Sequence, residues 1–282
     1  MKYYVYLQRR SADTFHNSAE FAVVQLNLHQ TFNAISARFG LGDTPDILRD
    51  YLRNSEATIS GSYPLLVLFP GLFIPNDLDV YLPYDVESAG WLFRHWIEDE
   101  CGYTCVEVYD SDDGPYPFHN PYIFMVTKHE KRIGDNILSI NLLCTTVNKL
   151  QIHSVLSYFP STVAMNAICS EGFVSMYPAL TVSQRGLELY PGRHEWISKY
   201  VGRGFDIRED LDAWLLFPHV CPYDGSCLRR IRRVGDHLTM FVPFIGSDSD
   251  ESYPWSPWHI PNSSGLCDIL FGKFSVKYSD VG

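Results

Sequence analysis

The spacing of apolar residues predicts two helices near the start of the chain. Over residues 18–39 apolar side chains recur at helical intervals, and Gly40 and Gly42 follow as stop signals. A second helix is expected directly afterwards, because Thr44 is a suitable N-cap and a proline occupies the first helical position. Residues 1–7, which are rich in tyrosine and valine, are expected to form an edge strand.

The middle of the chain alternates between strand patterns and helix patterns. Strands are expected at Ala57–Ser60, Asp77–Leu82, Thr104–Tyr109, Tyr122–Lys128 and Ile137–Thr145. Helices are expected at Leu65–Phe69 and at Val86–Asp99, the second with Trp91, Leu92, His95 and Trp96 facing inward. The resulting order, β-α-β-α-β-β-β, predicts a small mixed sheet.

Beyond Asn148 the pattern becomes mainly helical. Helices are expected at Leu150–Tyr158, Ser161–Ile168 and Glu195–Val201. Ser161, Thr162 and Asn166 are expected to cap and orient the middle helix, and a nucleotide contact from them is the alternative. Residues 246–265 are rich in Ser, Pro and Asp and are interpreted as an exposed loop. The fold class is therefore α/β (α+β): an N-terminal helical flank at 1–55, a sheet core at 56–150 and a C-terminal region at 151–282, expected to form one compact unit.

Composition agrees with a folded protein and excludes some partners. The chain is 46% hydrophobic and 15% aromatic, and its net charge of −11 argues against nonspecific binding to nucleic acid or to an anionic membrane. No apolar run approaches the roughly 18 residues needed to cross a bilayer, and the first ten residues do not resemble a secretory signal. We therefore expect an intracellular, cytoplasmic protein whose seven scattered cysteines are reduced structural thiols.

The strongest candidate for chemistry is a Gly-Ser turn followed by two carboxylates. Gly61-Ser62 ends one expected strand, and Asp77 and Asp79 lie two residues apart on the next, so that both project from one face. Paired carboxylates hold Mg²⁺, and a glycine turn before a helix receives phosphate. The alternative is that Asp77 belongs to a turn and Asp79 to a solvent-exposed strand face.

These residues resemble a known signature. Gly-Ser followed by Asp-x-Asp is similar to the nucleotidyltransferase superfamily, which has the DNA polymerase β-like fold, and the chain looks most like uncharacterised fungal nucleotidyltransferase-like proteins. The matching stretches are Ile59–Ser62, Asn76–Tyr81, Phe159–Asn166, Tyr177–Thr181, Lys199–Phe205, and the Cys221-Pro222 segment leading to Arg229, Arg230 and Asp236, within roughly residues 45–240. The resemblance implies that Asp77 and Asp79 ligate catalytic Mg²⁺, that Gly61 and Ser62 contact a bound NTP, and that a nucleotidyl group passes to an unknown acceptor.

One position departs from the pattern. The strand expected to bear a third acid carries Asn141, which cannot serve as a carboxylate ligand or base. Asp110, Asp112 and Asp113 would substitute only if their turn folded towards the site. Two hypotheses therefore stand: a Mg²⁺-dependent nucleotidyltransferase, or a catalytically inactive fold that binds a partner.

The sequence has one dense basic run and lacks several common catalytic and nucleotide-binding motifs. Arg229, Arg230, Arg232 and Arg233 could bind a triphosphate or an RNA backbone, but a solvated face paired with nearby acids is the favoured interpretation. Nucleophile-elbow, Walker-type, dinucleotide-binding and zinc-protease motifs are not found in the sequence.

Overall fold

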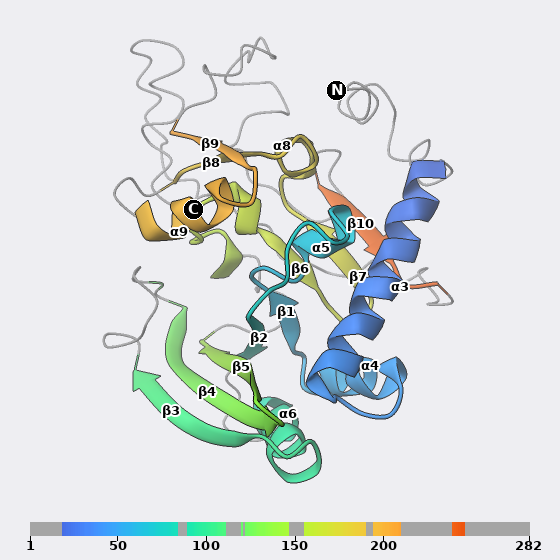
Figure 1. Cartoon of the computed structure of the whole chain (residues 1–282), viewed down its shortest axis with the longest axis vertical. Coiled ribbons are helices and arrows are strands. Elements are labelled where there is room, and N and C mark those ends of the chain that lie inside the picture. Colours follow the sequence, from blue (N-terminus) through green and yellow to red (C-terminus); the bar gives the residue numbers. More distant parts are fainter. Residues whose placement is uncertain are drawn as a thin grey trace, which may run out of the picture.

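A computed structural model of the chain describes residues 19–83, 89–110, 120, 122–146, 155–189, 194–209 and 239–245 (Figure 1). Several predictions lie outside these residues: the strand at 1–7, the loop at 246–265, the arginine run, and Asp112 and Asp113.

The two N-terminal helices form as predicted. Helix α3 (Ala19–Phe39) buries a stripe that includes Leu28, Phe32 and Ile35, while Leu26 on its other side is 51% exposed. Helix α4 (Pro45–Asn54) begins directly after Thr44, whose backbone is extended but whose side chain makes no capping hydrogen bond. Proline at the first position therefore marks the start of α4 without side-chain capping.

Within the described ranges, eight strands form a mixed sheet in the order β10-β7-β6-β1-β2-β5-β4-β3. Their bounds are β1 (Thr58–Ser60), β2 (Asp77–Pro83), β3 (Thr104–Asp110), β4 (Ile123–Ile133), β5 (Asn136–Thr145), β6 (Asn166–Ile168), β7 (Gly172–Ser175) and β10 (Met240–Pro243). Strands β2 and β5 pair in parallel, whereas the other neighbours are antiparallel. With α5 (Leu65–Leu68) and α6 (Ala89–His95), the predicted order β-α-β-α-β-β-β and the mixed α/β class are confirmed.

Each face of the sheet is covered by its own hydrophobic cluster. Along β2, Leu78 and Val80 pack into the cluster that contains the inner sides of α3 and α4, whereas Tyr81 packs into the second cluster. Because side chains alternate along a strand, Asp77 and Asp79 share the face of Tyr81. The helices α3 and α4 thus lie on the opposite face from the candidate site (Figure 1).

The predicted inward face of the helix at Val86–Asp99 is largely wrong. Helix α6 continues into a π-helical turn, η1 (Trp96–Glu100). Of the four residues expected inside, only Trp96 is buried; Trp91 and Leu92 are 49% and 41% exposed, and the side chain of His95 is 59% exposed. Apolar residues crowd this segment on every side, so spacing alone did not define one face, and the wider π turn then shifts the phase.

The predicted helix at Ser161–Ile168 is also wrong. The segment forms a short 3₁₀ turn, η3 (Thr162–Ala164), and then strand β6, which pairs with β1 and β7. Short, fully buried apolar runs look alike as strands and as helices, and here pairing with β1 decides the outcome. The predicted helix at Glu195–Val201 is present as α9 (His194–Val201).

Smaller elements complete the described part of the C-terminal region. They are α8 (Pro178–Val182) and the parallel strands β8 (Arg185–Leu187) and β9 (Asp206–Arg208). Among the described helices, none has the length and apolar character needed to span a membrane.

Candidate functional site

Parallel pairing of β2 with β5 brings together the two aspartates and Asn141. Asp77 is opposite Ser139 and Asp79 is opposite Asn141 in the register. The Asn141 amide Nδ2 donates hydrogen bonds to Asp77 Oδ2 at 3.1 Å and to Asp79 Oδ1 at 2.9 Å. The predicted shared face of the two carboxylates and the strand position of Asn141 are therefore as expected.

Asn141 compensates for the repulsion between the two half-buried carboxylates. An amide NH₂ has two donors, and here each faces one negative group. Hydrogen bonds to charged acceptors are stronger than neutral ones. These two hydrogen bonds therefore offset the repulsion between the carboxylates.

The same three residues fit one Mg²⁺ ion. The two carboxylates offer oxygen ligands on one face, and rotation of the Asn141 amide would turn its carbonyl oxygen towards them. A carboxylate at position 141 would be needed to bridge a second ion in the manner of two-metal sites. The donor set therefore suits a single hard cation bound mainly by Asp77 and Asp79.

Gly61 makes room for Asp79. It follows β1 with φ of +74°, a left-handed conformation that favours glycine. A Cβ atom placed on Gly61 would lie 2.3 Å from Asp79 Oδ2 and 3.2 Å from its Cγ. The group that the missing side chain of Gly61 accommodates is the Asp79 carboxylate.

Ser62 is hydrogen-bonded to an arginine that is distant in the sequence. It does not cap α5, which begins after Pro64 and has only four residues. The Ser62 Oγ instead accepts a hydrogen bond from Arg203 Nη1 at 2.9 Å, and Ser62 is only 4% exposed. A helix this short offers little dipole to an anion, so positive charge at this turn comes from Arg203 rather than from α5.

Arg203 is the functional candidate that sequence reasoning missed. Its guanidinium carbon lies 3.8 Å from the centroid of the Phe73 ring and 5.4 Å from that of Tyr200. Burial lowers the pKa of Arg203, while Tyr200 and Asp77 act in the opposite direction. In the sequence Arg203 lies between two glycines within the matching stretch Lys199–Phe205, but its 141-residue separation from Ser62 gave no hint of the contact.

Tyr200 is buried next to the hydrogen bond between Arg203 and Ser62. Burial raises the pKa of its hydroxyl to about 12, although the charge of Arg203 and a side-chain hydrogen bond with Ser62 act in the opposite direction. The negative charges of Asp79 and Asp77 raise it further. Tyr200 is therefore a neutral phenol at physiological pH and brings no negative charge next to Arg203 and Ser62.

Asp110 does not replace Asn141. Asp110 lies at the end of β3, three strands from β2, which corresponds to about 14 Å across a sheet. Directly opposite Asn141 on β4 stands Lys128, which pairs with Glu130 at 2.8 Å and with Glu107 at 4.0 Å. Asp110 is thus too far away to share an ion with Asp77 and Asp79.

Ser161 and Asn166 support the sheet. Ser161 Oγ accepts a hydrogen bond from the Val163 backbone at 3.3 Å and so caps η3 instead of the expected helix. The backbone carbonyl of Asn166 accepts a hydrogen bond from Ser60 Oγ at 2.7 Å. These contacts join η3 and β6 to the strand that carries the Gly-Ser turn.

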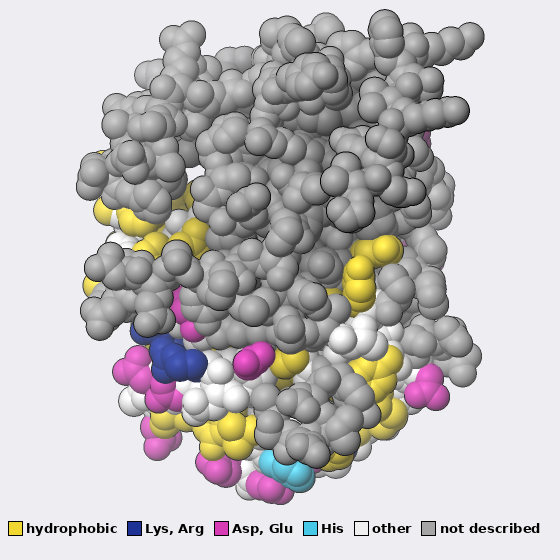
Figure 2. Space-filling view, turned by 180° about the vertical axis from the view of Figure 1, so that it is seen from behind, with side chains coloured by type: hydrophobic (Ala, Val, Ile, Leu, Met, Phe, Trp, Pro, Cys, Tyr) yellow, Lys and Arg dark blue, Asp and Glu magenta, His cyan; other side chains and the backbone are white. Residues whose placement is uncertain are grey.

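Acidic side chains are prominent on the lower part of the molecule seen from behind, beside a small basic group and apolar patches (Figure 2). This mixed surface fits the net charge of −11.

Comparisons with known proteins give distant structural matches. No family model and no curated protein matches the chain. Matching solved structures include a CCA-adding enzyme in apo form I (12% identity, TM-score 0.40, covering 61% of this chain and 41% of that chain). A second match is a tRNA-processing enzyme in apo form I, with 14% identity and a TM-score of 0.36, covering 57% of this chain and 43% of that chain. A third is a CCA-adding enzyme in complex with ATP, with 11% identity and a TM-score of 0.37, covering 62% of this chain and 42% of that chain. The chain is therefore distantly similar in structure to CCA-adding enzymes and spans about two-fifths of their length.

Proposed function

We propose that the protein is a nucleotidyltransferase-like protein that binds a Mg²⁺-complexed NTP and transfers a nucleotidyl group to an acceptor not yet known. The observation that carries the proposal is the β2–β5 pairing, which places Asp77, Asp79 and Asn141 side by side against the Gly61-Ser62 turn. Paired carboxylates beside a turn with an attached arginine are suited to a metal and a polyanion. The resemblance of the Gly-Ser and Asp-x-Asp signature to the nucleotidyltransferase superfamily points the same way.

Each residue has a distinct part in the proposed reaction. Asp77 and Asp79 would hold Mg²⁺, which when bound neutralises phosphate charge and aligns the attacking and leaving oxygens. Gly61 and Ser62 would contact the phosphates, and Arg203 would exchange its hydrogen bond to Ser62 for one to a phosphate oxygen. The acceptor hydroxyl would form a bond to the α-phosphorus of the NTP, and pyrophosphate would leave. The hydroxyl must also lose its proton; Asn141 cannot take it, and a carboxylate of the aspartate pair can.

A second candidate function is a non-catalytic protein that keeps this fold and binds a partner. The hydrogen bonds of the Asn141 amide to both carboxylates favour it, because they stabilise the pair without metal and leave the third-acid position without a carboxylate. In that case a nucleotide could still bind, but transfer would be absent.

Isothermal titration with Mg²⁺ and each NTP tests binding. The wild-type chain should bind at least one NTP in a Mg²⁺-dependent manner, and the double variant Asp77→Asn with Asp79→Asn should lose it. A matched control is Asp50→Asn with Asp99→Asn, since both are well-exposed carboxylates, 63% and 73%. Binding that survives the site variant would contradict the proposed site.

A transfer assay separates the two functions. Purified protein would be incubated with Mg²⁺, α-labelled NTP and a cell lysate, and labelled RNA or protein would be sought. Label that depends on Asp77 and Asp79 would establish transfer and exclude the non-catalytic candidate. Mg²⁺-dependent NTP binding without labelled product in any fraction would favour that candidate.

A further inference from the structure

A second group of chemically active side chains lies on the other face of the sheet. Asn141 is paired with Lys128, so the next residue of β4, His129, points to the opposite face. There, Glu98 from η1, Cys105 from β3 and His129 from β4 bring one ligand atom each to within 4.8 Å of one another. Three separate elements therefore converge at one point that plays no part in the proposed nucleotide site.

The register between β3 and β4 determines the positions of two of the three residues. Cys105 is directly opposite His129 in the β3–β4 pair, and a bulge follows between Cys105 and Glu107. Bulges re-aim side chains at strand edges. The third residue, Glu98, lies in the π-helical turn, and its Oε1 is 2.9 Å from His129 Nε2.

The His129 ring is fully buried beside a carboxylate. Its side chain is 0% exposed, and no described group donates a hydrogen bond to its Nδ1, which lies close to the backbone of Thr127. If Nε2 carries the proton and donates to Glu98, Nδ1 remains a buried acceptor without a donor, which is costly. If Nδ1 carries the proton, close to the backbone of Thr127, the lone pair of Nε2 faces the carboxylate oxygen of Glu98. A metal ion bound by both atoms removes that repulsion.

We propose that Glu98, Cys105 and His129 form a zinc site. Thiolate, imidazole and carboxylate together are a ligand set for Zn²⁺, whereas Mg²⁺ and Ca²⁺ prefer oxygen ligands alone. Binding converts the Cys105 thiol to a thiolate and releases its proton to solvent. Zn²⁺ bonds of about 2.0–2.3 Å place tetrahedral ligands roughly 3.3–3.7 Å apart. From separations of up to 4.8 Å the sulfur would therefore move closer by up to roughly 1.5 Å, while His129 Nε2 and Glu98 Oε1, now 2.9 Å apart, would separate slightly.

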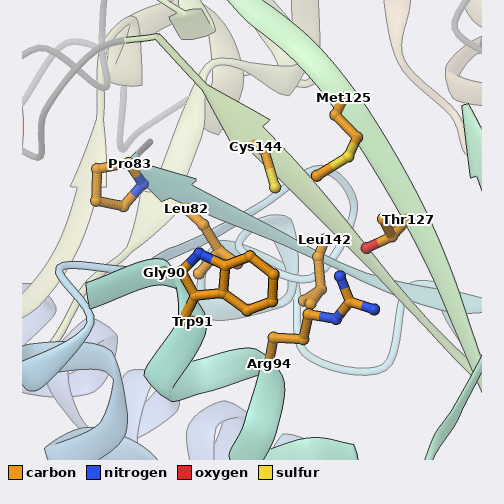
Figure 3. Close-up of a pocket in the computed structure, with 9 residues that line it drawn as sticks. All are labelled: Leu82, Pro83, Gly90, Trp91, Arg94, Met125, Thr127, Leu142 and Cys144. Atoms are coloured by element: carbon orange, nitrogen blue, oxygen red, sulfur yellow. The ribbon is translucent and has the colours of Figure 1, made fainter. Parts of the chain in front are cut away.

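Arg94 supports the site from outside the ligand set. Its Nε donates to Glu98 Oε1 at 3.0 Å, as expected of a residue that orients a ligating carboxylate. Arg94 also lines a pocket between α6 and the sheet, with Trp91 above it and Thr127 and Cys144 on the strands (Figure 3). Thr127 is two residues from His129 and shares its face. Because Glu98, Cys105 and His129 would supply three ligands, the fourth position of a tetrahedral Zn²⁺ would be left for water.

Cobalt substitution tests the proposal on the full chain. Purified protein freed of metal by a chelator would be titrated with Co²⁺, and the near-ultraviolet thiolate-to-cobalt band and the visible bands of tetrahedral Co²⁺ would be recorded. We expect one equivalent to produce both, and Zn²⁺ to abolish them by displacement. Cys105→Ser should remove the thiolate band and weaken Zn²⁺ binding at least tenfold.

Two further variants keep the test decisive. Cys144→Ser is the matched control, because Cys144 is a free thiol on the same sheet face but outside the cluster. It should leave the spectrum unchanged, while Glu98→Gln should weaken Zn²⁺ binding without relying on the buried His129. A thiolate band that persists in Cys105→Ser, a band lost in Cys144→Ser, or no band in the wild-type chain would overturn the zinc site.

Discussion

Replacing Gly61 with alanine should damage both the stability of the protein and its aspartate pair. The new Cβ would meet Asp79 Oδ2 at 2.3 Å, a distance that cannot persist, so either the turn or the carboxylate must move. Gly71 provides a matched control, because its φ of +75° is almost the same as the +74° of Gly61, yet nothing lies within 4 Å of a Cβ placed there.

The two variants separate backbone strain from steric conflict. A left-handed conformation costs a non-glycine residue about 1–2 kcal/mol, and this applies equally to Gly61→Ala and Gly71→Ala. Only Gly61→Ala adds a clash in a buried site, for which overpacking costs about 1–3 kcal/mol more. The expected loss in free energy of unfolding is therefore about 1–2 kcal/mol for Gly71→Ala and about 2–5 kcal/mol for Gly61→Ala.

Urea unfolding followed by circular dichroism measures the difference, and titration with Mg²⁺ and NTP measures its effect on the site. Gly61→Ala should have the lower midpoint and should lose Mg²⁺-dependent binding, while Gly71→Ala should retain binding. Equal midpoints for the two variants would refute the inference that Asp79 packs against Gly61.

Three further predictions concern single side chains. Arg203→Ala should weaken NTP binding in calorimetry at least tenfold through loss of a charged phosphate contact, whereas Arg208→Ala, which removes an exposed ion pair with Asp206, should not. Asn141→Asp should lower the free energy of unfolding by about 1.5–3 kcal/mol in chelator, because two hydrogen bonds to carboxylates become repulsions, and Mg²⁺ should restore it; equal melting temperatures in chelator would contradict this. Burial, together with the charge of Arg49, lowers the pKa of His29, whose Nε2 accepts a hydrogen bond from the Ile245 backbone at 2.8 Å. The unfolded chain therefore takes up this proton first, and the free energy of unfolding should fall as pH drops below about 6.5 towards the folded-state pKa; His29→Gln should make this pH dependence flatter.

The sequence was most informative where local pattern and pairing agree. The strand that carries Asp77 and Asp79, the strand that carries Asn141, and the glycine turn are all where periodicity and turn residues indicated. A period of two fixes which side chains share a face, and so the aspartate pair could be inferred from residue spacing alone.

What sequence could not supply were contacts between distant segments. The hydrogen bond from Arg203 to Ser62 depends on how the turn after α9 packs against the Gly61-Ser62 turn, which no local pattern encodes. The segment around Asn166 has an apolar run compatible with either a helix or a strand, and the pairing of β6 with β1 and β7 chose the strand. The convergence of Glu98, Cys105 and His129 likewise required the β3–β4 register.

The alternation of side chains between the two faces of β4 determines which sequence changes the protein can tolerate. The adjacent side chains of Lys128 and His129 lie on opposite faces of the sheet, as do the aspartate pair and the proposed zinc site. Substitutions at one of these two sites need not disturb the other, and their effects on the free energy of unfolding should be nearly additive. A one-residue insertion in β4 beside His129 would instead turn His129 away from Glu98 and Cys105, while Asp77, Asp79 and Asn141 on β2 and β5 would keep their pairing. The hairpin turn at Gly134 and Asp135 lies beyond the paired residues and is the place where added length would be tolerated. We therefore expect point substitutions to be able to erase either site by itself, whereas changes in chain length should be confined to the turn.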